Sequence, residues 1–222
     1  MSNILTVAFS GEGTSDERFM VGIVQRTFEA LAVECETDIE VFPTTYFPPP
    51  HLGDVRKNYE DLARKAFASG IQILCIHADA DGETDENVLK YKFAPALEQI
   101  NKIGNDKICK NLVEVIPVHM TEAWMLADKD ILKEEIGTTK PNQTLGLARD
   151  PETIADPKGV IIEALRVAQA EYPVKRKKIG IGALYQPLGQ KISLTRLDAL
   201  SSYSKFKEKA RAALVRLNYL RK

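Results

Sequence analysis

The sequence has few cysteines and no long hydrophobic run. Its three cysteines, Cys35, Cys75 and Cys109, lie far apart and form no C-x-x-C pair, so the sequence predicts neither a disulfide framework nor a zinc site. No apolar run approaches the roughly 18 residues of a transmembrane helix. The first residues also lack the positive segment of a secretory signal. We therefore expect a cytoplasmic protein that does not enter a membrane.

Two nucleotide-binding motifs and one calcium motif are also missing. The glycine-rich turn after the first apolar stretch carries Asp16 at the third glycine position of a dinucleotide fingerprint, which would bring negative charge toward a pyrophosphate. No Gly-Lys-Ser or Gly-Lys-Thr follows this turn, so a P-loop is excluded as well. A calcium loop starting at Asp79 would place Gly82 at its fourth rather than its sixth position and Lys90 at its twelfth. The sequence therefore does not predict an EF-hand.

Net charge is close to zero, but the charges are unevenly distributed along the chain. Residues 171–222 contain 13 Lys and Arg against 3 Asp and Glu, a net charge of +10, whereas residues 1–170 carry −11. Such asymmetry favours a cation-dependent acidic site beside a surface that can contact a polyanion. The alternative is that the basic helices are simply solvated, or docked on the acidic part of the chain.

Short apolar strands alternate with amphipathic helical stretches over most of the chain. The strands are expected at residues 4–9, 38–42, 71–81 and 112–118, and helices at 14–31, 55–68, 87–103, 121–127, 158–170 and, as one helix or two, 193–220. Pro95 should kink or split the helix that contains it. Strands separated by helices predict βαβ units, hence an α/β fold with a mainly parallel, Rossmann-like sheet and the 71–81 strand at its centre. We expect this core over residues 1–128, and a loop and basic helical extension, packed on the core, over 129–222.

Three acidic residues follow strands that should end at one edge of this sheet. Glu12 follows the first strand, and Asp79 and Asp81 end the central one. The carboxyl ends of parallel strands lie at the same edge, and alternate residues of a strand project to the same side. Carboxylates crowded together are stabilised by a cation between them, and an all-oxygen set suits Mg²⁺ or Mn²⁺ better than zinc. The sequence therefore predicts a divalent metal site formed by these three acids.

The motifs around these acids resemble those of the Toprim domain of topoisomerases, primases and OLD-family nucleases. The resemblance covers about residues 1–125 and consists of a hydrophobic strand followed by Glu12-Gly13 and a helix, then a hydrophobic strand followed by Asp79-Ala80-Asp81. It implies that Glu12, Asp79 and Asp81 are catalytic and bind the metal. Asp16 matches the charge, though not the length, of a second acid in the OLD-like branch.

A second segment, from Thr121 to Asp128, is similar to a Glu-x-Trp segment of small Toprim proteins that often accompany ATPases in phage-defence islands. This similarity implies that Glu122 joins Asp16 at a second metal and that an AAA- or ABC-type ATPase is a partner. The chain has neither the zinc module of a primase nor room for strand-passage domains, which leaves a nuclease acting on DNA or RNA. A homodimer is left open.

Nucleic-acid contact is expected from one set of basic residues near the C-terminus, which could hold phosphates in a salt-dependent way. The set is Lys175, Arg176, Lys177, Lys178 and Lys191. Two other functions stay open: a noncatalytic Toprim-like partner of nucleic acid or of an ATPase, and, ranked below it, a haloacid-dehalogenase-type phosphatase. The phosphatase ranks lower because Glu83 interrupts its Asp-x-Asp-Gly-Thr motif.

Several of these residues also have purely structural interpretations. Thr14 and Glu17 have the spacing of a helix capping box, and Asp16 could be only a favourable charge in the first helical turn. His77, in an apolar strand, is expected to be a hydrogen-bonded core residue, and Trp124 is expected in the core as well. Asp79 and Asp81 could simply form a turn before a glycine.

Overall fold

The computed structural model describes residues 3–49, 53–170 and 178–221. Its strands are β1 (Asn3–Leu5), β2 (Val7–Ser10), β3 (Ile39–Val41), β4 (Thr45–Tyr46), β5 (Ile73–His77) and β6 (Leu112–Val115). Its α-helices are α1 (Thr14–Ala32), α2 (Val55–Ala68), α3 (Glu86–Val88), α4 (Ala94–Asn101), α5 (Thr121–Met125), α6 (Lys129–Ile136), α7 (Pro157–Ala168), α8 (Tyr185–Lys191), α9 (Leu194–Leu197) and α10 (Ser201–Arg216). The π-helical segment η1 (Leu89–Phe93) joins α3 to α4, and η2 (Pro151–Thr153) and η3 (Ile181–Ala183) are short 3₁₀ turns. None of the described helices combines the length and the apolar character needed to cross a bilayer.

The strands form parallel sheets with β5 in an interior position. The main sheet has the order β4-β2-β5-β6, and β1 pairs with β3. Every ladder is parallel, with Cys75 of β5 lying between Phe9 of β2 and Val113 of β6. All residues of β5 are buried. The α/β fold with a parallel, Rossmann-like sheet is therefore confirmed, and so is the central place of the third expected strand.

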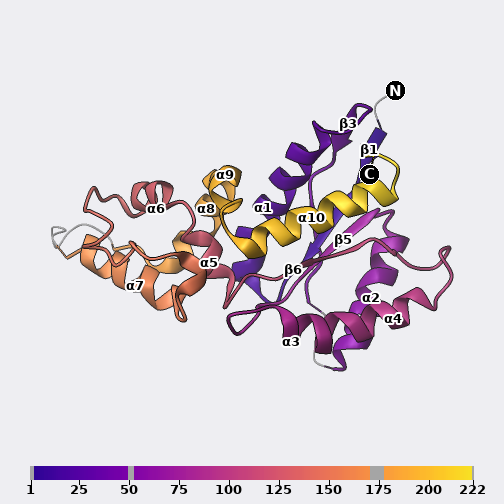
Figure 1. Cartoon of the computed structure of the whole chain (residues 1–222), viewed down its shortest axis with the longest axis horizontal. Coiled ribbons are helices and arrows are strands. Elements are labelled where there is room, and N and C mark those ends of the chain that lie inside the picture. The colour runs from indigo at the N-terminus through magenta and orange to yellow at the C-terminus, as the bar shows by residue number, and fades with distance from the viewer. Residues whose placement is uncertain (1–2, 50–52, 171–177, 222) are drawn as a thin grey trace.

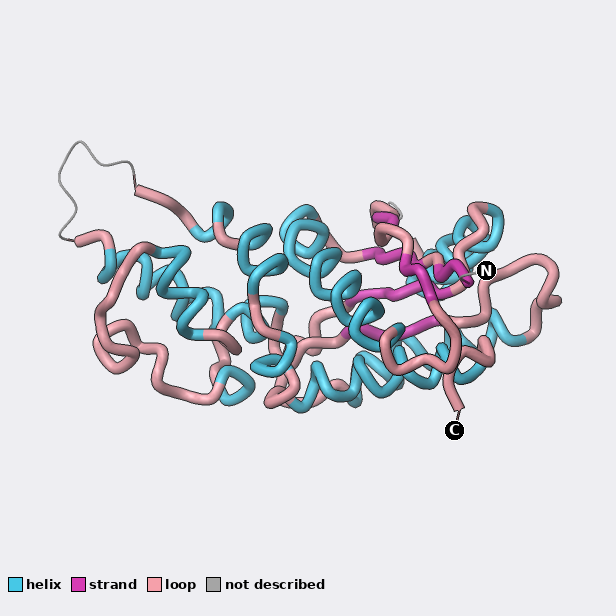
Figure 2. Tube along the Cα trace, turned by 90° about the horizontal axis from the view of Figure 1, so that it is seen from above, coloured by secondary structure: helices cyan, strands magenta, loops and turns pink. Residues whose placement is uncertain are grey.

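Helices cover both faces of this sheet, so that β2 and β5 are buried on both sides. Phe9 and Cys75 point into the core shared with α1 and α10, whereas Ala8 and Leu74 point into the core shared with α2 and α4. This alternation follows from the two-residue period of a strand. Figure 2 shows the sheet enclosed between helices at one end of an elongated molecule, with a helical part beside it.

The C-terminal helix returns from the helical part and lies across the sheet (Figure 1). Its Tyr203 and Phe206 pack against Trp124, with ring centroids 5.3 and 6.1 Å from that indole. Trp124 is fully buried, as expected. Beyond the helix, the carbonyl oxygen of Tyr219 accepts a hydrogen bond from the backbone N–H of Glu36, close to β3. One hydrophobic core therefore includes residues from both ends of the sequence.

Cations of α10 pair with acids of the sheet region. Lys205 contacts both carboxylate oxygens of Asp85 at 2.9 and 3.0 Å, and Asp85 is 8% exposed. Lys209 lies 3.2 Å from Glu114, which is on β6. The uneven charge of the sequence thus has a partly structural explanation, because part of the C-terminal positive charge neutralises acids of the sheet region.

Several boundaries differ from the expected ones. The third strand ends at His77 rather than at residue 81, and α6 and α8 were not predicted. Pro95 does split its helical stretch: it occupies the first turn of α4, directly after η1. The final helical stretch is divided into α9 and α10.

The predicted capping box of α1 is wrong by one residue. The N-cap is Gly13 rather than Thr14, and its N–H donates to Asp16 rather than to Glu17. Asp16 also accepts a hydrogen bond from a second backbone N–H, so its carboxylate serves this helix terminus better than the side chain of Glu17 does. The predicted role of Glu17 as a cap is therefore not found.

Glu152 anchors the start of α10, and its removal should destabilise the fold. Its two oxygens accept hydrogen bonds from the backbone N–H and hydroxyl groups of Ser201 and Ser202 at 2.6–2.9 Å. We expect Glu152→Ala to lower the free energy of unfolding by about 2 kcal/mol, since four donors lose a charged acceptor. Urea denaturation measures this. Glu163→Ala, which removes only an exposed pair with Arg166, should change the free energy of unfolding far less than Glu152→Ala does.

The contribution of Glu152 to the free energy of unfolding should depend on pH. Burial by itself raises the pKa of Glu152, but the hydrogen bonds from Ser202 and Ser201 outweigh it and hold the pKa below the usual value. A lowered folded-state pKa means that the contribution is complete above the unfolded pKa of about 4.3 and is lost as pH falls through the folded value. An equal stability difference between Glu152→Ala and the wild type at pH 7 and at pH 3 would contradict this assignment.

Candidate functional site at the carboxyl edge of the sheet

The carboxyl ends of β2, β5 and β6 meet at one edge of the sheet. From β2 the chain crosses to β4 on one side, then returns through α2 to β5 on the other side. The gap between the ends of β2 and β5 is therefore the topological switch point, where α/β sheets commonly bind ligands. Glu12 follows β2 and Asp79 follows β5, so the two acids flank this point. Acids that are far apart in the sequence were expected to meet at one edge because the strands before them should pair in parallel. The strands do pair in parallel.

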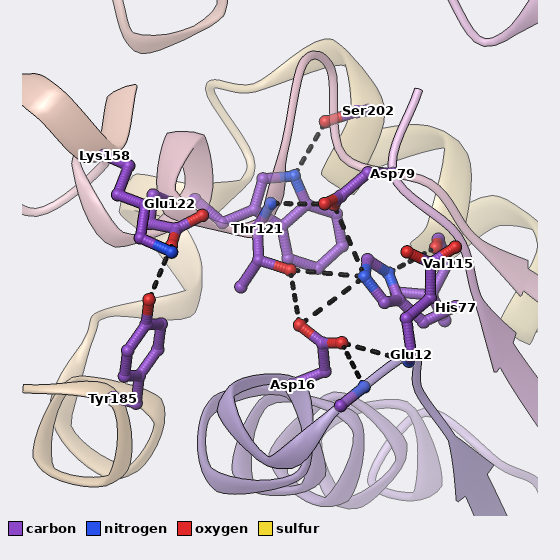
Figure 3. Close-up of polar contacts among 12 residues, drawn as sticks. Glu12, Asp16, His77, Asp79, Val115, Thr121, Glu122, Lys158, Tyr185 and Ser202 are labelled. Atoms are coloured by element: carbon purple, nitrogen blue, oxygen red, sulfur yellow. Dashed lines mark hydrogen bonds and ion pairs between the residues drawn. The ribbon is translucent and has the colours of Figure 1, made fainter. Parts of the chain in front are cut away.

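Asp16 connects the three loops at this edge (Figure 3). Its Oδ2 accepts hydrogen bonds from the backbone N–H groups of Glu12 and Gly13, both at 3.0 Å. Its Oδ1 accepts one from the hydroxyl group of Thr121 at 3.1 Å, and the backbone N–H of Thr121 donates to Asp79 Oδ1 at 2.9 Å. Asp16 is 7% exposed. These contacts favour a structural role, since three of its four lone pairs are already used.

His77 lies beneath these acids and is fully enclosed. Its Nδ1 is 3.0 Å from the carbonyl oxygen of Val115, which can only accept, so Nδ1 carries a proton. Its Nε2 lies 3.2 Å from the Thr121 hydroxyl, 3.4 Å from Asp79 and 3.7 Å from Asp16. Because the single hydroxyl proton of Thr121 goes to Asp16, Nε2 must donate, and the ring is then positively charged.

The pKa of His77 shifts in the direction that this assignment requires. Burial by itself lowers the pKa, but the hydrogen bond with Asp79, the charges of Asp16 and Asp79 and the Val115 carbonyl outweigh it and raise the pKa above its usual value. His77 is thus a hydrogen-bonded core residue, as expected. It balances part of the negative charge of Asp16 and Asp79, although it is only 2% exposed.

Asp79 and Glu12 each have one oxygen held by the protein. Asp79 Oδ1 accepts from Thr121 and faces His77, whereas its Oδ2 receives no hydrogen bond from any described residue. Glu12 Oε1 lies 3.4 Å from the ammonium group of Lys92, and its Oε2 likewise has no donor among the described residues. One fixed oxygen and one open oxygen on each acid suit the binding of a hard cation.

Asp81 is placed differently from the expectation. The extended backbone ends at His77, and Asp81 adopts a left-handed conformation with φ of 52°. Alternation along a strand therefore cannot place its side chain beside that of Asp79. The side chain is exposed and makes no hydrogen bond or ion pair with the described part of the chain, whereas its backbone N–H donates to the carbonyl oxygen of His119 at 3.0 Å. Its turn conformation favours the structural interpretation of this position.

Glu122 is the second residue of α5, directly after Thr121, and residues of the C-terminal part contact it. The hydroxyl group of Tyr185 donates to Glu122 Oε1 at 2.5 Å, and Lys158 Nζ lies 3.6 Å from the same oxygen. Glu122 is 5% exposed. Burial and the hydrogen bond to Glu122 raise the pKa of Tyr185, and the charges of Glu122, Asp16 and Asp79 act in the same direction. The phenol therefore remains a neutral donor at neutral pH.

The described residues contain no group of three or more His, Cys, Asp or Glu side chains arranged to hold a metal ion. The predicted set of Glu12, Asp79 and Asp81 is therefore not a complete three-ligand site in this conformation. Mg²⁺ commonly keeps several waters and binds through one or two carboxylates together with a phosphate of the substrate. The open oxygens of Glu12 and Asp79 fit such a loosely held ion, and do not fit a closed protein cage.

The predicted nucleic-acid residues are only partly covered by the structure. Lys175, Arg176 and Lys177 lie outside the described residues. Lys178 is exposed. Lys191 lies 2.6 Å from Glu135 and 3.5 Å from Glu134, so α6 already neutralises its charge. The prediction of nucleic-acid binding by this set remains untested.

Two cavities in the described part of the chain bear on the site. A small cavity of about 130 Å³ is lined by Glu12, Tyr59, His77 and Lys92, among others. A larger groove of about 1100 Å³ runs along α1 and α8 and includes none of the predicted acids. Of the two, the small cavity has the better claim to the site because it contains Glu12.

Sequence patterns missed four residues that contribute to the site. Lys92, Thr121, Lys158 and Tyr185 contact the predicted acids, but three of them lie on helices that reach this edge only through tertiary packing. Thr121 carries the one local signal, because it opens the helix directly before Glu122. The others follow no recognisable motif.

The chain matches no protein-family model, and no curated protein and no solved structure matches it. The resemblance to Toprim proteins therefore stays a prediction that depends on the short motifs around Glu12, Asp79 and Glu122.

Proposed function

We propose that the protein is a cytoplasmic, Mg²⁺- or Mn²⁺-dependent nuclease of the Toprim type, which hydrolyses phosphodiester bonds of DNA or RNA. The observation that supports this most is the position of Glu12 and Asp79 on either side of the switch point of a parallel sheet, each with one oxygen that receives no donor from the described residues. A divalent cation held there supplies Lewis-acid polarisation of a phosphodiester group and activation of water.

In this proposal each residue at the edge has a distinct task. Glu12 and Asp79 hold the cation, and Glu122 stays a candidate ligand of a second metal from the resemblance alone. Asp16 positions Glu12 and, through Thr121, Asp79. Asp81 stays a candidate ligand from the resemblance alone.

Two lysines near these acids supply positive charge for a bound phosphate. Lys158 contacts Glu122 and Lys92 contacts Glu12, and their side chains are 51% and 34% exposed. Because both side chains are partly exposed, their ammonium groups can contact a phosphate bound at the surface. There they can stabilise the negative charge that develops on the phosphate during hydrolysis. In this proposal Lys158 and Lys92 contact the phosphate, a role for which the sequence favoured basic residues of the C-terminal segment.

Cleavage of DNA and RNA substrates with and without Mn²⁺ tests this function. The wild type should cut only with the metal, and Asp79→Asn should reduce the rate at least about 100-fold. The asparagine keeps the acceptor for the Thr121 N–H and removes the charge, so folding should be retained, which a thermal melt checks. Asp61→Ala, an exposed acid on α2, is the control and should cut normally. Equal cutting by Asp79→Asn and the wild type would exclude the proposed site.

A noncatalytic Toprim-like partner of nucleic acid or of an AAA- or ABC-type ATPase is the second candidate. It is favoured by one observation: within the described chain, Asp16 and Glu122 already have protein donors and no three-ligand group is formed. Wild-type protein that binds DNA or an ATPase but cuts nothing with Mg²⁺ or Mn²⁺ would support this function over the nuclease.

A further inference from the structure

We infer that the small cavity beside Glu12 binds the ribose of a nucleic acid through its hydroxyl groups, so that the protein prefers RNA to DNA. The inference rests on the proposed function for the identity of the ligand, a nucleic acid, and it needs no metal ion. It narrows the class of substrate, because the 2′-hydroxyl group is what distinguishes RNA from DNA at a binding site.

The cavity lies between the main sheet and α2, at the carboxyl edge of the sheet. Its polar lining comes from three parts of the chain: the end of β2 with Ser10 and Glu12, α2 with Asn58 and Tyr59, and η1 with Lys92. Its volume is about 130 Å³. Pockets for a whole small molecule measure roughly 300–1,000 Å³, so this cavity takes one part of a larger ligand, such as a single sugar ring.

Two buried hydroxyl groups that line the cavity have no hydrogen-bond partner in the described part of the chain. They belong to Tyr59, which is 8% exposed, and to Ser10, which is 2% exposed. The ring of Tyr59 packs on Phe93 with centroids 5.0 Å apart, which limits the movement of its hydroxyl group. Buried polar groups are nearly always hydrogen-bonded, so two unpaired hydroxyl groups at one cavity indicate a polar occupant.

The charges around the cavity favour a neutral occupant over a phosphate group. Lys92 provides the one ammonium group among the described lining residues, and it lies 3.4 Å from Glu12 Oε1. His77 also lines the cavity, but the aspartates beside it balance its charge. A phosphate inside the cavity would therefore face the carboxylate of Glu12 without an unpaired cation to compensate for its burial.

The polar groups of the cavity match the hydroxyl groups of a sugar. Burial and the charge of Glu12 raise the pKa of Tyr59, so its phenol keeps its proton at neutral pH and can donate. The hydroxyl group of Ser10 and the amide of Asn58 can each donate or accept, and the open oxygen of Glu12 can accept. An acidic residue binds ribose hydroxyl groups in this way in α/β folds that hold dinucleotides.

Binding of short single strands in EDTA tests the inference, because no metal-dependent cleavage can then occur. The RNA and the DNA have the same sequence, with uracil in both, so that they differ only at the 2′ position. Contacts with phosphate groups are common to both strands and do not affect the comparison. We expect the wild type to bind the RNA at least about tenfold more tightly, as measured by fluorescence anisotropy.

A Tyr59→Phe variant tests the cavity itself, with Tyr203→Phe as a matched control. Tyr59→Phe removes one hydroxyl group from the cavity and keeps the ring that packs on Phe93. It should raise the Kd for RNA about fivefold and leave the Kd for DNA unchanged. Tyr203→Phe also removes a buried hydroxyl group, which lies 2.9 Å from Thr27 in the core on the other face of the sheet. It should change neither Kd.

The outcomes separate the inference from the function on which it rests. If the wild type cleaves with Mn²⁺ but binds RNA and DNA equally, the cavity holds only water, and the inference is wrong while the nuclease stands. A preference for RNA that is the same in Tyr59→Phe and the wild type also contradicts the inference. A preference that Tyr59→Phe weakens supports it, even if the wild type cuts nothing and the nuclease proposal fails. If the wild type binds neither strand, the inference is wrong.

Discussion

A Gly189→Ala variant should unfold with a free energy about 3 kcal/mol lower than the wild type. The new methyl group would lie 2.3 Å from the carbonyl oxygen of Phe19, and a methyl group on Gly22 would lie 2.7 Å from the carbonyl oxygen of Gly189. Because the atoms in the way belong to the backbone, no side-chain rotation can relieve the overlap. Helix α8 must move away from α1 instead.

The sign of this effect distinguishes packing from helix propensity. Alanine is the better helix former by roughly 1 kcal/mol, so it should stabilise α8 if no neighbour interfered. Gly182→Ala is the control, since its methyl group would contact nothing within 4 Å. Urea denaturation of both variants measures the difference. A Gly189→Ala variant as stable as Gly182→Ala would mean that α8 does not pack against α1 in this way.

Asp16→Ala should cost about 3 kcal/mol as well, for an electrostatic reason. Three donors lose their acceptor: the backbone N–H groups of Glu12 and Gly13 and the hydroxyl group of Thr121. Each hydrogen bond to a charged group contributes about 1.5–3 kcal/mol, and a buried donor left unpaired adds a desolvation cost. The loss is partly offset by water that enters the space vacated by the carboxylate.

Asp130→Ala is the matched control for this substitution. Asp130 also lies in the first turn of a helix, α6, but its side chain is 72% exposed and its ion pairs are longer than 3.5 Å. Its removal should therefore change the free energy of unfolding by less than about 0.5 kcal/mol. Thermal melts of the two variants give the comparison. Equal, small losses would show that the hydrogen bonds of Asp16 do not stabilise the loops at the carboxyl edge.

The Asp16→Ala variant also bears on how the site works. Loss of Asp16 should free the backbone around Glu12 and the hydroxyl group of Thr121, while Asp79 keeps its own hydrogen bond from the Thr121 N–H. If Asp16 is a positioning residue rather than a ligand, Asp16→Asn should bind Mn²⁺ nearly as well as the wild type. A loss of Mn²⁺ binding equal to that of Asp79→Asn would restore Asp16 as a ligand, as the resemblance implied.

Much of the fold could be read from the sequence because strands and helices leave local, periodic patterns. Helix 55–68 was predicted with the bounds that α2 has, and the apolar run before Asp79 indicated the interior strand β5. The parallel sheet followed from the alternation of strands and helices, and it brings the loops of Glu12, Asp79 and Glu122 to one edge. Each of these conclusions depends on residues that are neighbours in the chain.

Only the tertiary structure decided which groups surround the acids. Tyr185 reaches Glu122 across 63 residues, and α10 brings Lys205 to Asp85 across 120. The conformation of Asp81 was also beyond the sequence: its φ is positive, and its backbone N–H donates to the carbonyl oxygen of His119, which lies in a loop distant in the sequence. The physical reason is common to all three. The apolar period of a sequence predicts whether a side chain is buried. Which residue contacts that side chain depends on how helices far apart in the sequence pack together.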